Sequence, residues 1–194
     1  MKLVPTTARR VVAIAAAAAA ALAISTAAYA ATSSGTASTA PTLIPRCTAS
    51  DLGVWLAVDQ GNGAAGTIYY PLEFTNLSGH TCSMYGFAGV SAISRGGQQL
   101  GSPANWESGG SFGTPRTVIV PPGATAHAIL GYHDVVVSTT SGCDPVNTTF
   151  ELRVYPPDQR GAAFAFFDLK ACSHAGPIYL SVGSVKPGVG TING

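Results

Sequence analysis

The chain has 194 residues, and charged side chains make up only 10% of it, with 10 Lys and Arg against 9 Asp and Glu and a formal net charge of +1. A soluble domain averages about 25% charged residues, so this surface is sparsely charged. Because nucleic-acid binding requires clustered basic residues, the near-neutral charge excludes a strongly basic nucleic-acid binder. It equally excludes an acidic solvating tail.

Residues 1–30 have the pattern of a secretory signal peptide. Basic residues precede a 14-residue apolar run at 11–24, and Ala-Tyr-Ala at 28–30 is a small-x-small cleavage site. Since about 20 apolar residues are needed to span a bilayer, we expect cleavage after residue 30, with a retained anchor as the alternative. The pair Arg9-Arg10 leaves both general and twin-arginine export open.

Residues 31–46 are rich in Ser, Thr, Ala and Pro and contain one charged residue. A segment of this composition cannot bury enough apolar surface to fold, so we expect a disordered tether. Without residues 1–30 the chain holds 7 basic and 9 acidic residues, a formal charge of −2. The sequence therefore predicts one domain at 47–185, followed by a flexible C-terminal tail at 186–194.

Four cysteines lie in the predicted domain, at positions 47, 82, 143 and 172. An even number of cysteines in an exported chain favours two disulfides, because the compartment outside the cytoplasm is oxidising. Three pairings are possible, and the strand pattern between the cysteines indicates which one forms.

The first predicted hairpin lies between Cys47 and Cys82. Apolar residues alternate with other residues at 52–59 and at 68–74, and a Gln-Gly-Asn-Gly hairpin signal lies between the two runs. An antiparallel hairpin centred near residue 63 brings Cys82 to within about three residues of the position opposite Cys47. A bulge or a small register change covers that difference, so we expect a local disulfide between these two cysteines.

The second predicted hairpin has strands at 150–155 and 162–167, joined by a Pro-Pro-Asp-Gln-Arg-Gly turn centred near residue 159. The same arithmetic brings Cys172 to within about three residues of the position opposite Cys143. We therefore expect a Cys143–Cys172 disulfide, with the crossed pairings as alternatives. Each disulfide closes a loop of about 30 residues and contributes about 3 to 4 kcal/mol in the chain-entropy model.

The rest of the domain also reads as short strands. No segment after residue 31 shows a helical period with caps, and turns rich in Gly and Pro separate the further strands, predicted at 87–93, 116–120, 124–130 and 178–185. This pattern predicts an all-β fold, an immunoglobulin-like antiparallel β-sandwich with two disulfides. Pro71 cannot donate a ladder hydrogen bond, so its strand is expected at an edge or with a bulge. Trp55 and Cys47 are expected in the core.

Four segments resemble the signature blocks of an actinobacterial exported family called domain of unknown function 4232: CTASDL at 47–52, CSMYGFAGV at 82–90, LRVYPP at 152–157 and ACS at 171–173. The similarity extends over about residues 47–185. It implies an exported, disulfide-bearing β-sandwich from a high-GC Gram-positive bacterium, and it implies no activity and no catalytic residue. Ala88 departs from the family pattern, which has Pro at this position.

A serine hydrolase is the catalytic alternative. Gly109-Gly-Ser-Phe-Gly113 matches G-x-S-x-G, in which the serine lies on a strained turn from a strand to a helix. Here no strand precedes Ser111, and a strand is predicted after it, so the segment reads as a flexible glycine loop. Carboxylate-pair chemistry is the second version of the hydrolase, with acidic residues such as Glu73, Glu107 and Asp134, but their spacing selects no pair.

A copper site is the metal alternative. His80, Cys82 and Met84 alternate along one predicted strand face and are soft ligand types. A blue-copper site also needs a second histidine and a free thiolate, whereas Cys82 is expected in a disulfide. We therefore expect no metal site and no cofactor.

Residues 101–115 are the segment that suggests a binding surface. They show no repeating apolar pattern, and they are long for a connection in a compact domain. Trp106 lies there between Asn105 and Glu107. An exposed Trp beside polar residues is suited to stacking on a sugar ring or on the apolar patch of a partner. We therefore predict these three residues as a binding site.

These patterns together predict an exported, non-catalytic module, secreted or associated with the cell wall after removal of the signal peptide. The expected partner is an extracellular protein or a cell-wall polymer. Nucleic acid is not expected as a partner, and no membrane span is expected once residues 1–30 are removed.

Overall fold

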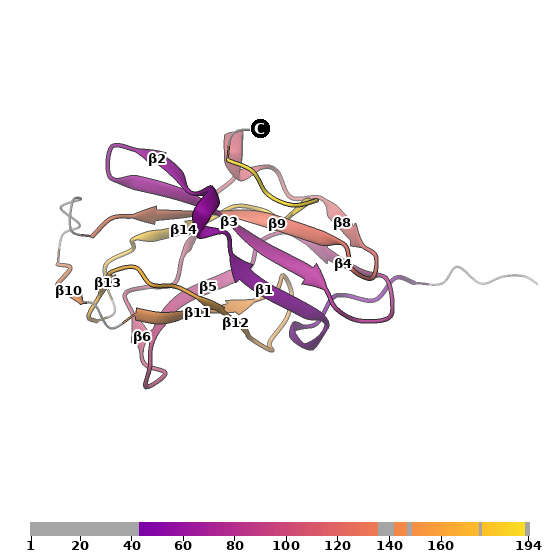
Figure 1. Ribbon diagram of the computed structural model, residues 1–194, viewed down its shortest axis with the longest axis horizontal. Helices are drawn as coiled ribbons and strands as arrows, with labels where there is room; N and C mark the ends of the chain where they lie inside the picture. The colour runs from indigo at the N-terminus through magenta and orange to yellow at the C-terminus, as the bar shows by residue number, and fades with distance from the viewer. Residues whose placement is uncertain (1–42, 136–141, 147–148, 175, 193–194) are drawn as a thin grey trace, which may run out of the picture. The chain divides into compact units, whose positions relative to one another are not determined.

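The computed structural model describes residues 43–135, 142–146, 149–174 and 176–192 (Figure 1). They belong to one of the two compact units into which the chain divides, the unit that begins at Pro41. The predicted signal peptide and residues 31–42 of the predicted tether lie outside the described residues.

The larger of two main sheets has seven strands. Their order is β1-β3-β9-β14-β7, with β2 pairing to β3 and β15 pairing to β9. All pairs are antiparallel except β14 with β7. The strands are β1 (Leu52–Leu56), β2 (Asn62–Ala64), β3 (Thr67–Asn76), β7 (Asn105–Trp106), β9 (Thr125–His133), β14 (Leu180–Val182) and β15 (Lys186–Pro187).

The second main sheet has four strands in the order β12-β11-β5-β6, all antiparallel. They are β5 (Gly89–Ser94), β6 (Gln99–Leu100), β11 (Thr149–Tyr155) and β12 (Ala163–Phe166). Figure 1 shows this sheet as a layer beside the layer that contains β3 and β9.

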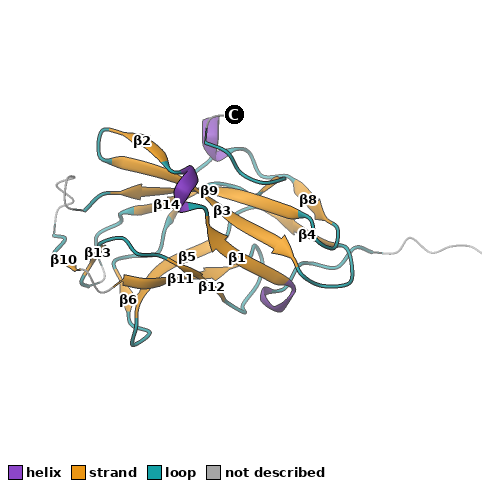
Figure 2. Cartoon of the chain, viewed as in Figure 1, coloured by secondary structure: helices purple, strands orange, loops and turns teal. Residues whose placement is uncertain are grey.

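Two small sheets complete the domain. One pairs β4 (Cys82–Tyr85) with β8 (Thr117–Val120), and the other pairs β10 (Pro145–Val146) with β13 (Ala171–Cys172). The helical segments of the described residues are three short 3-10 turns (Figure 2): η1 (Ala49–Asp51), η2 (Val58–Gln60) and η3 (Gly110–Phe112). In the part of the chain that the structure describes, no helix has the length and apolarity required to cross a membrane.

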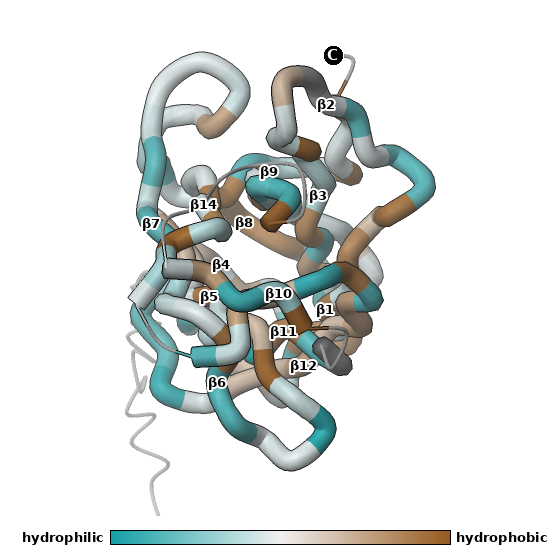
Figure 3. The backbone as a smooth tube through the Cα atoms, turned by 90° about the vertical axis from the view of Figure 1, so that its left-hand side faces the viewer, coloured by the Kyte–Doolittle hydropathy of each residue, from teal (hydrophilic) through white to brown (hydrophobic). Residues whose placement is uncertain are grey.

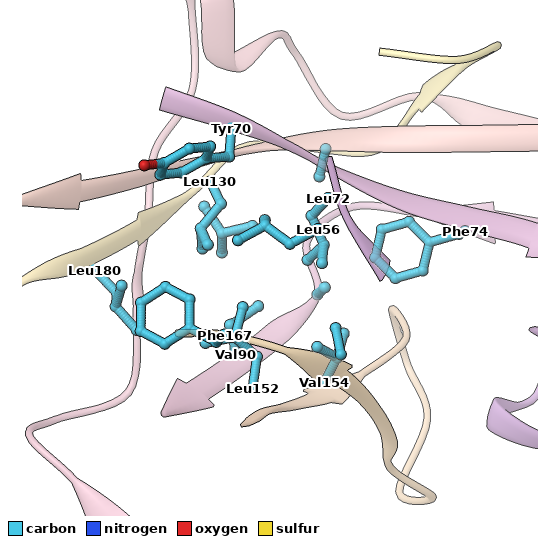
Figure 4. Close-up of a cluster of buried hydrophobic side chains, with 14 of the residues drawn as sticks. Leu56, Tyr70, Leu72, Phe74, Val90, Leu130, Leu152, Val154, Phe167 and Leu180 are labelled. Atoms are coloured by element: carbon cyan, nitrogen blue, oxygen red, sulfur yellow. The ribbon is translucent and has the colours of Figure 1, made fainter. Parts of the chain in front are cut away.

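The core lies between the two main sheets. On the inner face of β3, Leu72 and Phe74 are 0% exposed, and their side chains point toward Leu152 and Val154 of β11, also 0% exposed (Figure 4). Each fully buried side chain of this size stabilises the fold by about 1.5 to 3 kcal/mol. Figure 3 shows the same partition, with apolar segments along the inner strands and hydrophilic ones in the loops. The prediction of an all-β sandwich with two disulfides is confirmed.

The disulfides join Cys47 to Cys82 and Cys143 to Cys172, with Cα–Cα distances of 4.9 and 5.0 Å. These are the two local pairs that the hairpin spacing indicates. In the second hairpin, Glu151 of β11 faces Phe166 of β12. β10 and β13 continue the same register beyond the hairpin. They pair Cys172 with Pro145, which lies two positions after Cys143.

The first disulfide forms by a different route. Leu52 faces Asn76, so β1 and β3 are centred on residue 64, one residue from the predicted centre. Cys82 does not continue β3, however, but begins β4. Cys47 lies beside β4, where its N–H donates to the carbonyl oxygen of Ser83 at 3.0 Å.

Pro71 does not mark an edge strand, because β3 lies between β1 and β9. The missing N–H is instead accommodated on the β1 side of β3. There β1 ends at Leu56, and the carbonyl oxygen of Pro71 accepts the N–H of Ala57 at 2.9 Å. Because Pro71 can accept but not donate at this position, the ladder stops here, and β2 takes over the same side of β3.

Three other expectations require correction. Trp55 is 42% exposed and not in the core, because the outer face of β1 carries it. The end of the predicted tether is paired, since Ser83 donates its N–H to the carbonyl oxygen of Pro45 at 2.8 Å. Residues 186–192 of the predicted tail are likewise ordered, because their backbone groups bond to β9 and to the buried carboxylate of Glu73. No apolar period in the sequence indicates these bonds.

Candidate binding site

The loop predicted to bind a ligand is held to both main sheets. Before β7, the N–H of Ala104 donates to the carbonyl oxygen of Val90 in β5 at 2.8 Å. β7 itself pairs in parallel with β14, and the N–H of Glu107 donates to the carbonyl oxygen of Val182 at 3.0 Å. A two-residue strand shows no alternation, so the sequence pattern could not predict it. The result is an aromatic residue on a fixed backbone.

The side chain of Trp106 is held in place yet remains 65% exposed. Its indole N–H donates to the carbonyl oxygen of Ala88 at 3.0 Å. Its ring stacks on that of Phe87, with centroids 5.5 Å apart and planes 12° apart. Offset stacking of this kind contributes about 0.5 to 1.5 kcal/mol beyond the buried area. The indole orientation is therefore set before any ligand arrives.

Trp106 forms part of an open groove of about 510 Å³, a volume within the usual range for ligand sites. We call it the aromatic groove. Its walls come from the end of β4, the start of β5, β7, the segment before β8, and the end of β11 with the turn after it. The lining residues are Tyr85, Gly86, Phe87, Gly89, Trp106, Pro115, Tyr155, Pro156, Asp158 and Gln159.

The polar side chains of the aromatic groove are placed by a tight turn after β11. The N–H of Gln159 donates to the carbonyl oxygen of Pro156 at 3.0 Å, and Asp158 has a φ of 59°. A Pro at the second position and a positive φ at the third are the features of a type II turn, and Asp tolerates that φ better than most residues. The turn therefore brings a carboxylate and a carboxamide to the groove beside the aromatic rings.

Charge in the groove is sparse. Asp158 is the single carboxylate among the ten lining residues, and none of the ten is basic. Asp158 forms an ion pair with Arg46 at 3.6 Å, and because both side chains are exposed the pair contributes at most about 1 kcal/mol. Beside the groove, the guanidinium of Arg153 lies 5.9 Å from the ring centroid of Tyr155.

The other two predicted binding residues do not line the groove. Asn105 is exposed and Glu107 is half-buried, but neither is among the lining residues. Successive strand residues point to opposite faces, which explains why Asn105, the other residue of β7, does not line the groove. Sequence reasoning missed most of the lining, although six of the ten residues lie in the two segments at 82–90 and 152–157 that carry the family resemblance.

The residues of the hydrolase alternative lie elsewhere. Ser111 is in η3, between Gly109 with a φ of 86° and Gly113 with a φ of 75°, and not at a turn from a strand to a helix. Its carbonyl oxygen accepts a hydrogen bond from Lys186 Nζ at 2.9 Å. Glu73 is 1% exposed, so a substrate does not reach its carboxylate in this conformation.

Two of the three residues of the copper alternative are not available as ligands. Cys82 is in a disulfide, and Met84 is 1% exposed in the core, whereas His80 is exposed. Within the described ranges, no group of three His, Cys, Asp or Glu side chains is placed to hold a metal ion.

Comparison with known protein families finds a match. The family model described as Domain of unknown function (DUF4232) matches residues 47–186. No curated protein and no solved structure matches the chain. The matched range includes every residue that lines the aromatic groove.

Proposed function

The chain belongs to the family described as Domain of unknown function (DUF4232), and from this premise we propose that it is an exported, non-catalytic binding module whose aromatic groove holds an extracellular ligand. The family description names no activity, so the proposal rests on the protein's own surface. The ligand is a component of the cell envelope, either a wall polymer or an extracellular protein.

One observation carries the proposal. Trp106 is 65% exposed while its N–H and one stacking partner hold it in place inside an open groove. Large exposed apolar surface is unfavourable in water and commonly marks interaction sites. Trp and Tyr are the residues that most often dominate binding energy, and the groove contains both. A fixed aromatic side chain also loses little conformational entropy on binding.

Export is supported by the covalent structure and by the N-terminal pattern. Two disulfides are typical of proteins from oxidising compartments. The signal-peptide pattern at 1–30 and the Ser/Thr/Ala/Pro-rich segment that follows it suit a module displayed on a tether outside the cell. In this proposal the producing cell is an actinobacterium, and the module is secreted or associated with its wall.

Co-sedimentation of the oxidised protein with cell-wall preparations tests the proposal. We expect the protein to pellet with the wall, and Trp106→Ala to reduce the bound fraction strongly. Trp55→Ala is the matched control, because Trp55 is also a partly exposed Trp on a strand but does not line the groove. Equal loss of binding in both variants would contradict a role for the groove. If the wild type does not pellet, cross-linking to secreted proteins with the same variants becomes the decisive assay.

The hydrolase alternative has its own test. If Ser111 were a nucleophile, the protein would hydrolyse ester substrates and Ser111→Ala would abolish the activity. We expect neither the wild type nor the variant to hydrolyse a panel of esters and glycosides. Turnover that disappears in Ser111→Ala would overturn the non-catalytic proposal.

A further inference from the structure

The shape of the aromatic groove restricts what it can hold. The ring of Phe87 stacks on the indole of Trp106, with planes 12° apart, and Trp106 remains 65% exposed, so the exposed indole is a flat apolar surface supported by a second ring. Tyr85 and Tyr155 line the same groove. A flat surface packs well against a flat ligand with an apolar face, and the C–H face of a pyranose ring is such a surface.

The free hydrogen-bonding groups of the groove include both donors and acceptors. The indole N–H of Trp106 is already bonded to Ala88, so the Trp offers its ring face and no donor. The remaining polar groups are tyrosine hydroxyls, the Asp158 carboxylate and the Gln159 carboxamide. This mixture of donors and acceptors matches sugar hydroxyls, which both donate and accept.

The charge of the groove further restricts the ligand. Among its ten lining residues there is one carboxylate and no basic side chain. An anionic polymer would therefore meet no counter-charge from the lining and some repulsion from Asp158, which Arg46 offsets in part. A neutral sugar ring meets no electrostatic repulsion in the groove. An amine-bearing ring is attracted by the charge of Asp158 and by the aromatic faces, which bind cations.

We infer that the aromatic groove binds a carbohydrate chain of neutral or amine-bearing pyranose rings, one ring stacked on Trp106 and its hydroxyl or amine groups bonded to Asp158 and Gln159. The inference rests on the proposed function, because it names the ligand class of the same site. It excludes anionic polysaccharides as the preferred ligands, and a proline-rich peptide is the competing ligand that the experiment includes.

Tryptophan fluorescence tests the inference directly, because the chain has two Trp residues. In Trp55→Phe the remaining Trp lies in the groove, so its emission reports occupancy. The probes are chitotetraose as a neutral sugar, its fully deacetylated form as an amine-bearing sugar, a tetragalacturonate as an anionic sugar, and a proline-rich peptide. Calorimetry on the unmodified protein repeats the titrations, in case the Phe substitution alters folding.

We expect saturable binding of both chitin-derived probes, with the deacetylated form the tighter of the two at a pH where its amines are charged. Asp158→Asn should remove the preference for the deacetylated probe over the neutral probe, because it removes the charge that attracts the amines. Trp106→Ala should weaken both by about tenfold or more, which corresponds to about 1.4 kcal/mol. Tighter binding of the anionic sugar or of the peptide would overturn the inference.

Failure of the inference can be separated from failure of the proposed function. If Trp106-dependent co-sedimentation with the wall persists while neither chitin-derived probe changes the fluorescence or the heat, the module binds the wall but the ligand class is wrong. If co-sedimentation and protein cross-linking both fail to depend on Trp106, the proposed function itself is wrong and the inference falls with it.

Discussion

Glu73 lies on β3 with 1% of its surface exposed. Its Oε1 accepts the N–H of Gly190 at 2.8 Å, whereas Oε2 is buried without a hydrogen-bond partner among the described residues. Burial raises the pKa of Glu73, and the bond from Gly190 opposes the rise. Its cross-strand neighbour His127 donates from Nδ1 to the carbonyl oxygen of Gly188. Burial lowers the pKa of His127, and the charge of Lys186 lowers it further, whereas the bond to Gly188 opposes the shift. Burial therefore favours the uncharged form of both side chains.

A pH dependence of stability follows from Glu73. Because its pKa is higher in the folded state than the ordinary value of 4.5, the folded state binds more protons than the unfolded state. The contribution of Glu73 to the free energy of unfolding is complete below pH 4.5 and is lost as the pH rises through the raised pKa. One group changes this free energy by at most about 1.4 kcal/mol per pH unit. Glu73→Gln should remove this decline.

Urea unfolding at a series of pH values measures the effect, as the difference between wild type and Glu73→Gln. Taking the difference cancels the contribution of His127. Because the pKa of His127 is lowered, its effect on stability runs in the opposite direction: the stabilisation is present above the ordinary histidine pKa and is lost as the pH falls. A difference that does not vary with pH would show that Glu73 is not the group that titrates.

At the scale of the element, the C-terminal segment at 186–192 covers the outer face of the seven-stranded sheet. β15 pairs with β9, and Gly190 is buried against Pro71 and the His127 ring. A Cβ at Gly190 would lie 2.6 Å from Pro71 Cβ and 2.9 Å from His127 Cδ2. These contacts are too close, so the segment has to move away from the sheet if residue 190 gains a side chain.

We expect Gly190→Ala to lower the free energy of unfolding by about 1 to 3 kcal/mol, the usual cost of overpacking. Hydrogen exchange should increase at the β15 backbone and at the Glu73 side of β3. Gly79→Ala is the control, because a Cβ at Gly79 meets nothing within 4 Å, and a surface change of that kind shifts stability by about 0.5 kcal/mol or less. Equal effects of the two substitutions would contradict the packing of this segment.

The elements that the sequence predicted well are those whose order is local. Alternation located β3, and turn spacing placed the centres of the β1–β3 and β11–β12 pairs to within about one residue, because antiparallel neighbours in a hairpin are related by simple arithmetic. The pattern could not locate β7, β13 or β15, since two residues carry no period. β7 and β15 form because the longer strands β14 and β9 offer ladder groups beside them, whereas β13 pairs with the equally short β10.

At the scale of the whole molecule, the disulfides close loops of 35 and 29 residues by sequence separation. We expect replacement of either pair by Ala to lower the free energy of unfolding by about 3 to 4 kcal/mol, chiefly by freeing the unfolded chain. Denaturant titration of each double variant under non-reducing conditions measures the loss. A change below about 1 kcal/mol would show that the unfolded state is already compact in that region.

The aromatic groove could be predicted only in part. Trp106 was identifiable because a lone Trp in a long polar loop is unusual. The other aromatic residues of the groove could not be identified, because each ends or follows a strand and has the sequence context of an ordinary strand residue. Only the folded chain brings Tyr85, Phe87 and Tyr155 together. Adjacency to Trp106 does not identify further lining residues, since neither Asn105 nor Glu107 lines the groove, and neighbours in a strand such as β7 point to opposite faces.

The Cys47–Cys82 disulfide has a mechanical consequence. Cys82 begins β4, and β4 ends at Tyr85 in the groove, so the point where the chain enters the domain is joined to the groove wall by one covalent bond and one short strand. In the oxidised protein the shortest covalent path from residue 45 to the groove wall passes through this bond, whereas in the reduced protein it passes through β1 and β3. A pull applied between these two points therefore loads the β1–β3 ladder only after reduction.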